Sequence, residues 1–154
     1  MSAAALNAET KDIVIDEVFP HTAEMIWKAL TSAQLIARWL MQPTGFEAVE
    51  GNSFTFQTKP GGNWDGVIHC RVLEVVANRR LVYAWRGGHE SNDGYGSRLD
   101  TVVAFTLTRV PEGTRLTLVH SGFVTPVNDI AFQNMSNGWR KVVPNLGTFA
   151  NGPH

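Results

Sequence analysis

The feature that most constrains this chain is the spacing of its apolar residues. From residue 44 to residue 120 they recur at every second position, in runs at 46–49, 53–58, 67–76, 81–85, 101–109 and 114–120. A period of two is typical of strands that bury one face of a sheet. Turn-forming segments such as Pro60-Gly61-Gly62-Asn63 and Pro111-Glu112-Gly113 lie between runs. This part of the chain therefore predicts an antiparallel meander.

The residues before the meander predict a strand and two short helices. Residues 12–19 alternate as a strand, and Pro20 ends it because proline cannot donate to a sheet ladder. An N-cap at His21 or Thr22 begins the first helix. The segment Thr31-Ser32-Ala33-Gln34 resembles the start of a second helix, which Pro43 closes.

After the meander the apolar residues step by three and four along one face of a helix expected over residues 127–149. Pro144 lies inside this helix and removes the hydrogen bond to the carbonyl of Arg140. We therefore expect the helix to kink near residues 140–143 or to end there.

This order of elements predicts an α+β fold: a curved antiparallel sheet of about seven strands, two short helices after the first strand, and a long C-terminal helix. At 154 residues the chain predicts one domain. We expect that domain over residues 11–150, after a flexible segment at 1–10. One helix cannot cover a strongly bent sheet completely, so we expect a cavity between the helix and the concave face.

Composition and charge disfavour several classes of function. The net charge is −1, and the longest basic run is the pair Arg79-Arg80. Nucleic-acid binding needs a basic face, so we expect no nucleic-acid partner. No window is apolar enough for a membrane span or a signal peptide, so we expect no stable membrane insertion. The single cysteine, Cys70, excludes an internal disulfide and favours a cytoplasmic location.

Four stretches, in this order, resemble the AHSA-type domains (homologues of the activator of heat-shock-chaperone ATPase) within the SRPBCC or START-like superfamily. They are Val18-Phe19-Pro20 with Ala23 to Thr31, Leu35 to Leu40, Gly66 to Val75 with Arg80 to Trp85, and Gly113 to Phe123 followed by Gly138-Trp139. The resemblance covers most of residues 11–147 and implies the helix-grip fold. The superfamily includes lipid carriers, polyketide cyclases, hormone receptors and a chaperone cofactor linked to stress response. Pro144 and Gly147 depart from its usual last helix, so we expect the cavity to differ in shape under residues 143–150.

In such a fold, large apolar side chains of the inner sheet face and the last helix converge on the cavity. We expect its ligand-binding residues to be Trp39, Phe56, Ile68, Tyr83, Trp85, Phe105, Leu118, His120, Phe132, Met135 and Trp139.

His120 is the most informative titratable residue, because its parity places it on the inner face with Leu116 and Leu118. It could donate a hydrogen bond to a ligand or act as an acid or base. Alternatively it is a structural histidine bonded to a neighbouring strand or to the helix. We favour the structural role, because no carboxylate partner is predictable from spacing.

The run at 67–76 can be placed in two ways. If Ile68, Cys70 and Val72 point inward, then His69 and Arg71 form a solvated outer face, which we favour. The inward parity then reaches Glu74, which predicts a bulge near residues 72–75 or a buried carboxylate paired with arginine. If instead a bulge reverses the parity, Arg71 enters the cavity and favours an anionic ligand. The glycine-rich segment 87–96 could be an entrance lid or an ordinary hairpin loop.

Three functions fit these patterns. The first is binding of a hydrophobic or amphipathic small molecule by a monomer or homodimer. The second is a cyclase/aromatase- or hydrolase-like enzyme in which His120, Tyr83 or Glu74 moves protons. The third is a chaperone-cofactor-type interaction module, which predicts an exposed apolar patch and little cavity volume. No cofactor, catalytic residue or metal site is expected, because no two histidines have ligand spacing and Cys70 stands alone.

Overall fold

The computed structural model describes the backbone of residues 9–151 and the side chains of residues 9–148. Its elements follow in the order β1 (Thr10–Phe19), α2 (Ala23–Thr31), α3 (Ala33–Trp39), β2 (Pro43–Thr44), β3 (Ser53–Gln57), β4 (Val67–Val76), β5 (Arg80–Gly87), β6 (Leu99–Val110), β7 (Gly113–Val124) and α4 (Asp129–Asn151). The flexible segment expected at 1–10 lies outside the described residues, apart from Glu9 and Thr10. Within the described part of the chain, no helix is long and apolar enough to cross a membrane.

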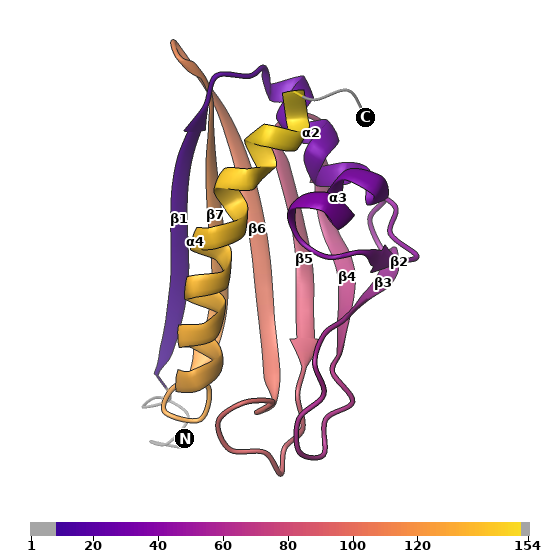
Figure 1. Cartoon of the computed structure of the whole chain (residues 1–154), viewed down its shortest axis with the longest axis vertical. Coiled ribbons are helices and arrows are strands. Elements are labelled where there is room, and N and C mark those ends of the chain that lie inside the picture. The colour runs from indigo at the N-terminus through magenta and orange to yellow at the C-terminus, as the bar shows by residue number, and fades with distance from the viewer. Residues whose placement is uncertain (1–8, 152–154) are drawn as a thin grey trace, which may run out of the picture.

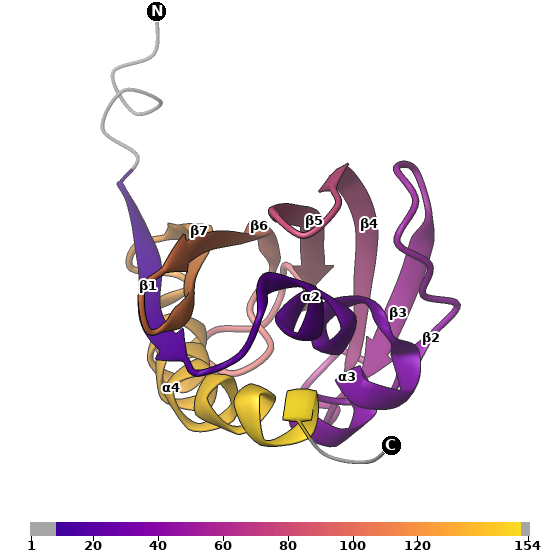
Figure 2. The same cartoon turned by 90° about the horizontal axis from the view of Figure 1, so that it is seen from above.

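The strands form one antiparallel sheet in the order β1-β7-β6-β5-β4-β3-β2. Figure 1 shows α4 running along the β1–β7 side of the sheet and leaning toward α2 at its C-terminal end. Figure 2 shows the sheet curving around the helices, with α2 and α3 on the same concave side as α4. The predicted α+β class with a helix-grip arrangement is confirmed.

Alternation of buried and exposed residues builds the core on this concave face. One rung of the ladder crosses five neighbouring strands, and every member of it is buried: Ile13, His120, Val103, Tyr83 and Val72. The prediction that His120 lies on the inner face is confirmed.

Strand β4 has the favoured parity, and the reversed parity that would place Arg71 in the cavity is wrong, because Arg71 is exposed on the outer face. Its inward residues Ile68, Cys70 and Val72 are buried, and a register shift follows between Val72 and Glu74. The shift is the predicted bulge, and it returns Glu74 to the outer side, where its carboxylate lies 3.1 Å from Arg80 Nε with both side chains about half exposed. The alternative of a buried carboxylate is wrong.

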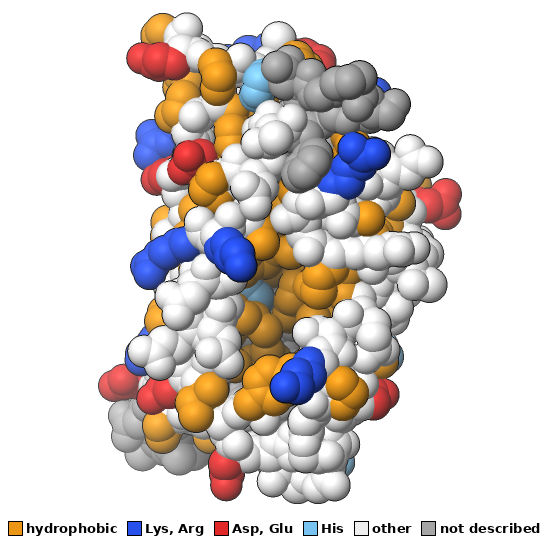
Figure 3. All heavy atoms as spheres, in the orientation of Figure 1, with side chains coloured by type: hydrophobic (Ala, Val, Ile, Leu, Met, Phe, Trp, Pro, Cys, Tyr) orange, Lys and Arg blue, Asp and Glu red, His pale blue; other side chains and the backbone are white. Residues whose placement is uncertain are grey.

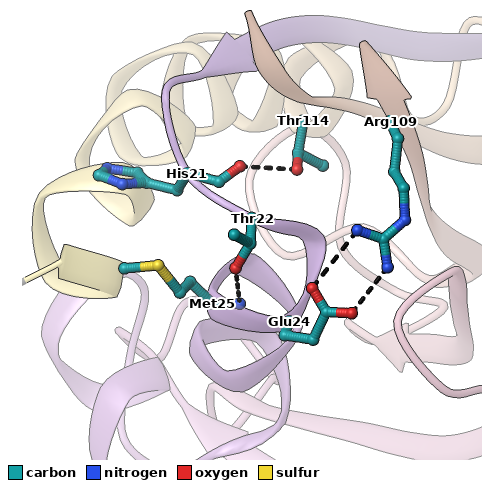
Figure 4. A network of polar contacts seen from close by, with 6 residues as sticks. All are labelled: His21, Thr22, Glu24, Met25, Arg109 and Thr114. Atoms are coloured by element: carbon teal, nitrogen blue, oxygen red, sulfur yellow. Dashed lines mark hydrogen bonds and ion pairs between the residues drawn. The ribbon is translucent and has the colours of Figure 1, made fainter. Parts of the chain in front are cut away.

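Helices α2 and α3 begin at side-chain caps. Thr22 Oγ1 accepts a hydrogen bond from Met25 N, and Ser32 Oγ accepts one from Leu35 N. Two contacts fix the start of α2 to the far end of the β6–β7 hairpin (Figure 4): Arg109 pairs with Glu24 at 2.7 Å, and Thr114 donates to the His21 carbonyl at 2.7 Å.

One predicted strand is wrong. Residues 46–49 do not pair with the sheet, and the short strand β2 forms earlier, at Pro43–Thr44. The Asn52 side chain explains the difference, because its Oδ1 accepts from Glu47 N and its Nδ2 donates to the Gly45 carbonyl, both at 3.0 Å. These bonds hold the segment as a compact turn in place of a ladder.

Helix α4 continues through Pro144 to Asn151, so the expectation that it could end near residue 143 is wrong. Proline costs the helix one donor and leaves the Arg140 carbonyl without its usual partner. Arg140 and Pro144 are both exposed, so water can satisfy that carbonyl. The buried neighbours Val143 and Leu146 hold the helix on the core on both sides of the proline.

Candidate ligand-binding cavity

A cavity of about 290 Å³ lies on the concave side of the sheet, between the N-terminal half of α4, the end of α3 and two loops. In Figure 3 the surface beside α4 is hollowed, and hydrophobic side chains wall the hollow. The lining residues are Leu40, Met41, Thr58, Trp64, Ile68, Trp85, Gly88, Tyr95, Gly96, Ser97, Leu99, Ala131, Asn134, Met135, Gly138, Trp139 and Val142.

The wall of the cavity is mainly apolar. Among the described residues that line it there is no aspartate, glutamate, lysine, arginine or histidine, and the polar side chains besides the aromatic ones are Thr58, Ser97 and Asn134. A charged ligand group would lose its hydration here without gaining an opposite charge. The site therefore suits an uncharged molecule.

Two loops close the cavity at the end of the sheet opposite Figure 4. The β5–β6 loop meets the β3–β4 loop through Asn92, which accepts from Asn63 N at 3.1 Å and donates to the Gly61 carbonyl at 2.8 Å. Trp64 and Tyr95 add a ring contact between the two loops, with centroids 5.8 Å apart. The segment 87–96 thus contributes to the cavity wall, and its opening as a lid stays a prediction.

The β5–β6 loop is also tied to the start of α4. Asn128 Nδ2 donates to Ser97 Oγ and to the Arg98 carbonyl, both at 2.9 Å, while its Oδ1 accepts from Val124 N at 2.9 Å. Asn128 is buried, so these bonds are shielded from water. The cavity wall is therefore joined to the end of β7 as well as to the other loop.

His120 lies fully buried behind this wall. Trp139 Nε1 donates to His120 Nδ1 at 3.0 Å, so the neutral ring carries its proton on Nε2. His120 Nε2 lies 2.8 Å from Thr101 Oγ1, which donates onward to the Trp85 carbonyl at 2.7 Å. Burial lowers the pKa of His120 from 6.5 to about 3. Both ring nitrogens are engaged within the protein, as a structural histidine requires.

Trp85 lacks a partner for its indole nitrogen. Its side chain lines the cavity and the residue is only 3% exposed, yet its Nε1 has no hydrogen-bond partner among the described residues. A buried N–H without an acceptor is unfavourable, and most structures avoid it.

The structure brings four of the eleven expected ligand-binding residues to the cavity: Ile68, Trp85, Met135 and Trp139. The others lie outside its lining: Trp39, Phe56, Tyr83, Phe105, Leu118, His120 and Phe132. Six of these seven are buried in the core, and Phe132 is partly buried and packs against it. For example, Trp39 Nε1 donates to the Ala29 carbonyl at 2.8 Å while its ring contacts Phe105 edge-on. Ligand contact by any of the eleven stays a prediction.

The sequence interpretation missed most of the wall. Asn134 and Gly138 lie four residues apart beside the apolar stripe of α4, so a wider stripe would have included them. Trp64, Tyr95 and Ser97 come from loops that meet through contacts about 30 residues apart, and no local pattern signals such a meeting.

Elsewhere in the core, Cys70 is buried and desolvation raises the pKa of its thiol, so its thiolate is disfavoured. In the part of the chain that the structure describes, no cluster of three or more His, Cys, Asp or Glu side chains could hold a metal ion.

Comparison with solved structures finds the same fold in bacterial proteins. Protein MLL2253 from Mesorhizobium loti is 33% identical, with a TM-score of 0.78 over 90% of this chain and 96% of that one. Protein BH1534 from Bacillus halodurans, solved in solution, is 24% identical, with a TM-score of 0.71 over 92% of this chain and 97% of that one. The second likeness supports the fold alone.

Comparison of sequences identifies the family. The mouse (Mus musculus) protein "Activator of 90 kDa heat shock protein ATPase homolog 2" is 25% identical over 139 residues, which are 90% of this chain and 37% of the mouse protein. This chain therefore spans well under half the length of that relative. The family model described as "Activator of Hsp90 ATPase homolog 1-like protein" matches residues 20–150. The chain belongs to this family and is an AHSA-type domain of the SRPBCC superfamily.

Proposed function

We propose that this protein binds a hydrophobic or amphipathic small molecule in the cavity beside α4. The observation that carries the proposal is an apolar hollow of about 290 Å³ that opens to the surface beside α4, next to a closely packed core. Small-molecule sites are typically concave, mostly apolar and fitted with a few polar groups. A void without an occupant forfeits contacts between its walls, so a retained one favours a binding role.

The volume suggests a modest ligand. At about 290 Å³ the space lies near the lower end of the range of small-molecule sites. This favours a compact molecule with one or two rings over a long lipid chain. The lone, buried Cys70 supports a cytoplasmic location as part of the proposal.

An enzymatic use of the same cavity has less support. Acid–base catalysis needs a titratable group within reach of the bound molecule. His120 has both nitrogens engaged and a pKa near 3, and Glu74 lies on the outer side against Arg80. Tyr95 lines the cavity, but its hydroxyl donates to the Lys59 carbonyl.

A chaperone-cofactor role is the second candidate. The family is described by activation of the Hsp90 ATPase, and the edge strand β1 exposes Val14 and Val18 by 58% and 49%. Both valines belong to the outward parity of β1, away from the cavity. A Val14→Asp/Val18→Asp variant tests it: if the chain stimulates the ATPase of an Hsp90-type chaperone, the double variant should lose that stimulation and keep ligand binding.

The cavity proposal is tested by native mass spectrometry of freshly purified protein, followed by thermal unfolding with a panel of neutral one- and two-ring compounds. We expect a co-purified small mass or a saturable rise in melting temperature, because a ligand that binds only the folded state stabilises it.

The decisive variant is Gly138→Trp, since Gly138 lines the cavity and has open space around its Cα. The indole should occupy the opening and abolish the ligand-induced shift. Gln133→Trp is the matched control, an exposed position of the same helix that lies outside the cavity lining. If both variants lose the ligand-induced rise in melting temperature equally, or if neither loses it, the ligand binds somewhere other than this cavity.

A further inference from the structure

Two tryptophans stand side by side at the cavity and differ in one respect. The rings of Trp85 and Trp139 have centroids 5.7 Å apart, and both residues are 3% exposed. Trp139 Nε1 donates to His120, whereas Trp85 Nε1 has no partner among the described residues. Trp85 therefore carries an unpaired indole N–H on a residue that lines the cavity, which makes it a candidate donor to a bound molecule.

The packed neighbours of Trp85 offer no acceptor to this nitrogen. Its ring contacts Phe56, His120 and Trp139. Phenylalanine has no acceptor atom, and an indole N–H only donates. His120 Nδ1 is taken by Trp139, and Nε2 is committed to Thr101. None of these three neighbours supplies an acceptor, and Trp85 is one of the residues that line the cavity.

The charge of the wall restricts the acceptor further. The described lining residues carry no cationic side chain, so a carboxylate or phosphate would be buried without a counter-charge. A neutral acceptor, such as a carbonyl, ester or ether oxygen, avoids that cost. The flanking apolar and aromatic side chains suit the rest of such a molecule.

We infer that the cavity takes an uncharged, largely apolar or aromatic compound whose neutral acceptor atom receives a hydrogen bond from Trp85 Nε1. The inference rests on the proposed binding function and specifies its ligand class. Trp85 is then the specificity-determining residue of the site, because it separates compounds of one shape by the presence of an acceptor.

Three probes of matched shape test it: 2-acetylnaphthalene, 2-isopropenylnaphthalene and 2-naphthoate. The first has a ketone oxygen, the second a methylene group in its place, and the third a carboxylate. By calorimetry at pH 7.5 we expect the ketone to bind about fivefold more tightly than the alkene, the size of a typical net hydrogen bond. The carboxylate should bind more weakly than either.

Trp85→Phe should abolish the preference for the ketone over the alkene. Trp64→Phe is the matched control, because Trp64 also lines the cavity but its Nε1 already donates to the Val67 carbonyl at 3.1 Å. The control should keep the preference. Loss of the preference in both variants, or in neither, overturns the role of Trp85.

A second readout uses the wild-type protein and does not depend on how well the variant folds. In a ¹⁵N-indole spectrum, the Nε1–H resonance of Trp85 should lie further downfield with the ketone than with the alkene, while that of Trp139, which is already hydrogen-bonded to His120, should be nearly the same with both. An unmoved Trp85 resonance at saturating ketone contradicts the inference. If all three probes fail to bind, the proposed function fails with it. If ketone and alkene bind equally, only the acceptor inference fails.

Discussion

The two halves of α4 face the same sheet with opposite packing. The C-terminal half carries Val143, Leu146 and Gly147, which are buried, and Gly147 lies so close to Phe19 that an added Cβ would stand 2.5 Å from its ring. The N-terminal half carries Met135 and Gly138, which border empty space. One helix thus closes the core at one end and leaves it open at the other.

This difference shows how one helix packed on a curved sheet can both stabilise the fold and leave room for a ligand-binding site. Around the packed half, α2 and the ion pair of Figure 4 fix the β6–β7 hairpin to the helices. Around the open half, loops replace helices, and side-chain hydrogen bonds from Asn92 and Asn128 hold the wall in place. We therefore expect the stability of the fold to depend mainly on the packed C-terminal half of α4, and ligand binding to depend mainly on the open N-terminal half.

His120 accepts a hydrogen bond from Trp139, which lies between the two halves of α4. Protonation of His120 is expected to have the largest effect on the stability of the folded protein. Its pKa is about 3 in the folded protein and near 6.5 in the unfolded chain. The unfolded state therefore binds the proton first, and stability is full above pH 6.5 and lost as pH falls toward 3. The total loss is about 5 kcal/mol, with a slope of about 1.4 kcal/mol per pH unit in the middle of that range.

Urea unfolding at pH 7.5, 6.0, 5.25 and 4.5 measures this slope before most carboxylates titrate. His120→Gln supplies the control, since a neutral amide keeps polar atoms near Trp139 and Thr101 but cannot take up a proton. The variant should be less stable at pH 7.5 and nearly independent of pH down to 4.5. A slope as steep in the variant as in the wild type would assign the acid sensitivity to other groups.

The second largest effect is expected from truncating one apolar side chain in each half of α4 and comparing the loss of unfolding free energy. Leu146→Ala should cost about 3 kcal/mol, because it opens a void where the side chain is fully buried. Met135→Ala should cost less than about 1.5 kcal/mol, because Met135 is partly exposed and already borders the cavity. Leucine and methionine have similar helix propensities, so the pair isolates packing. Similar costs in chemical denaturation would show that the two halves are packed alike.

Much of the fold could be predicted from the sequence because its signals are local. Alternation located the long strands, and the capping residues at 21–22 and 31–34 located the helix starts, which the structure places at the caps Thr22 and Ser32. The inward parity of Glu74 predicted either a β4 bulge or a buried carboxylate, and the structure has the bulge. Each of these inferences needs only a few neighbouring residues.

The features that could not be predicted depend on side-chain contacts that the apolar pattern does not signal. Asn52 folds its own turn and prevents the strand expected at 46–49. The partner of His120 proved to be an indole on α4, so a search for a carboxylate could not find it. The cavity was expected between the helix and the concave face with eleven lining residues, but seven of them lie outside its lining, and the space is bordered by loops as well as by α4.

The smallest effects, and the sharpest test of the two halves, come from the two glycines of α4. Glycine in a helix interior costs about 1 kcal/mol relative to alanine. Gly138 has open space around it, so Gly138→Ala should stabilise the protein by up to about 1 kcal/mol. Gly147→Ala should instead destabilise it by about 1–2 kcal/mol, because the new methyl group would overlap the buried Phe19 ring.

Both substitutions have the same chemistry in the same helix, so opposite signs in urea midpoints would have to arise from the surroundings. A Gly147→Ala/Phe19→Leu double variant sharpens the point. If the clash with the ring causes the loss, removing that ring should make the alanine at 147 less costly than in the wild-type background. Stabilisation by both alanines would mean that the packed half has free space after all, and destabilisation by both would mean that the space beside Gly138 is already occupied.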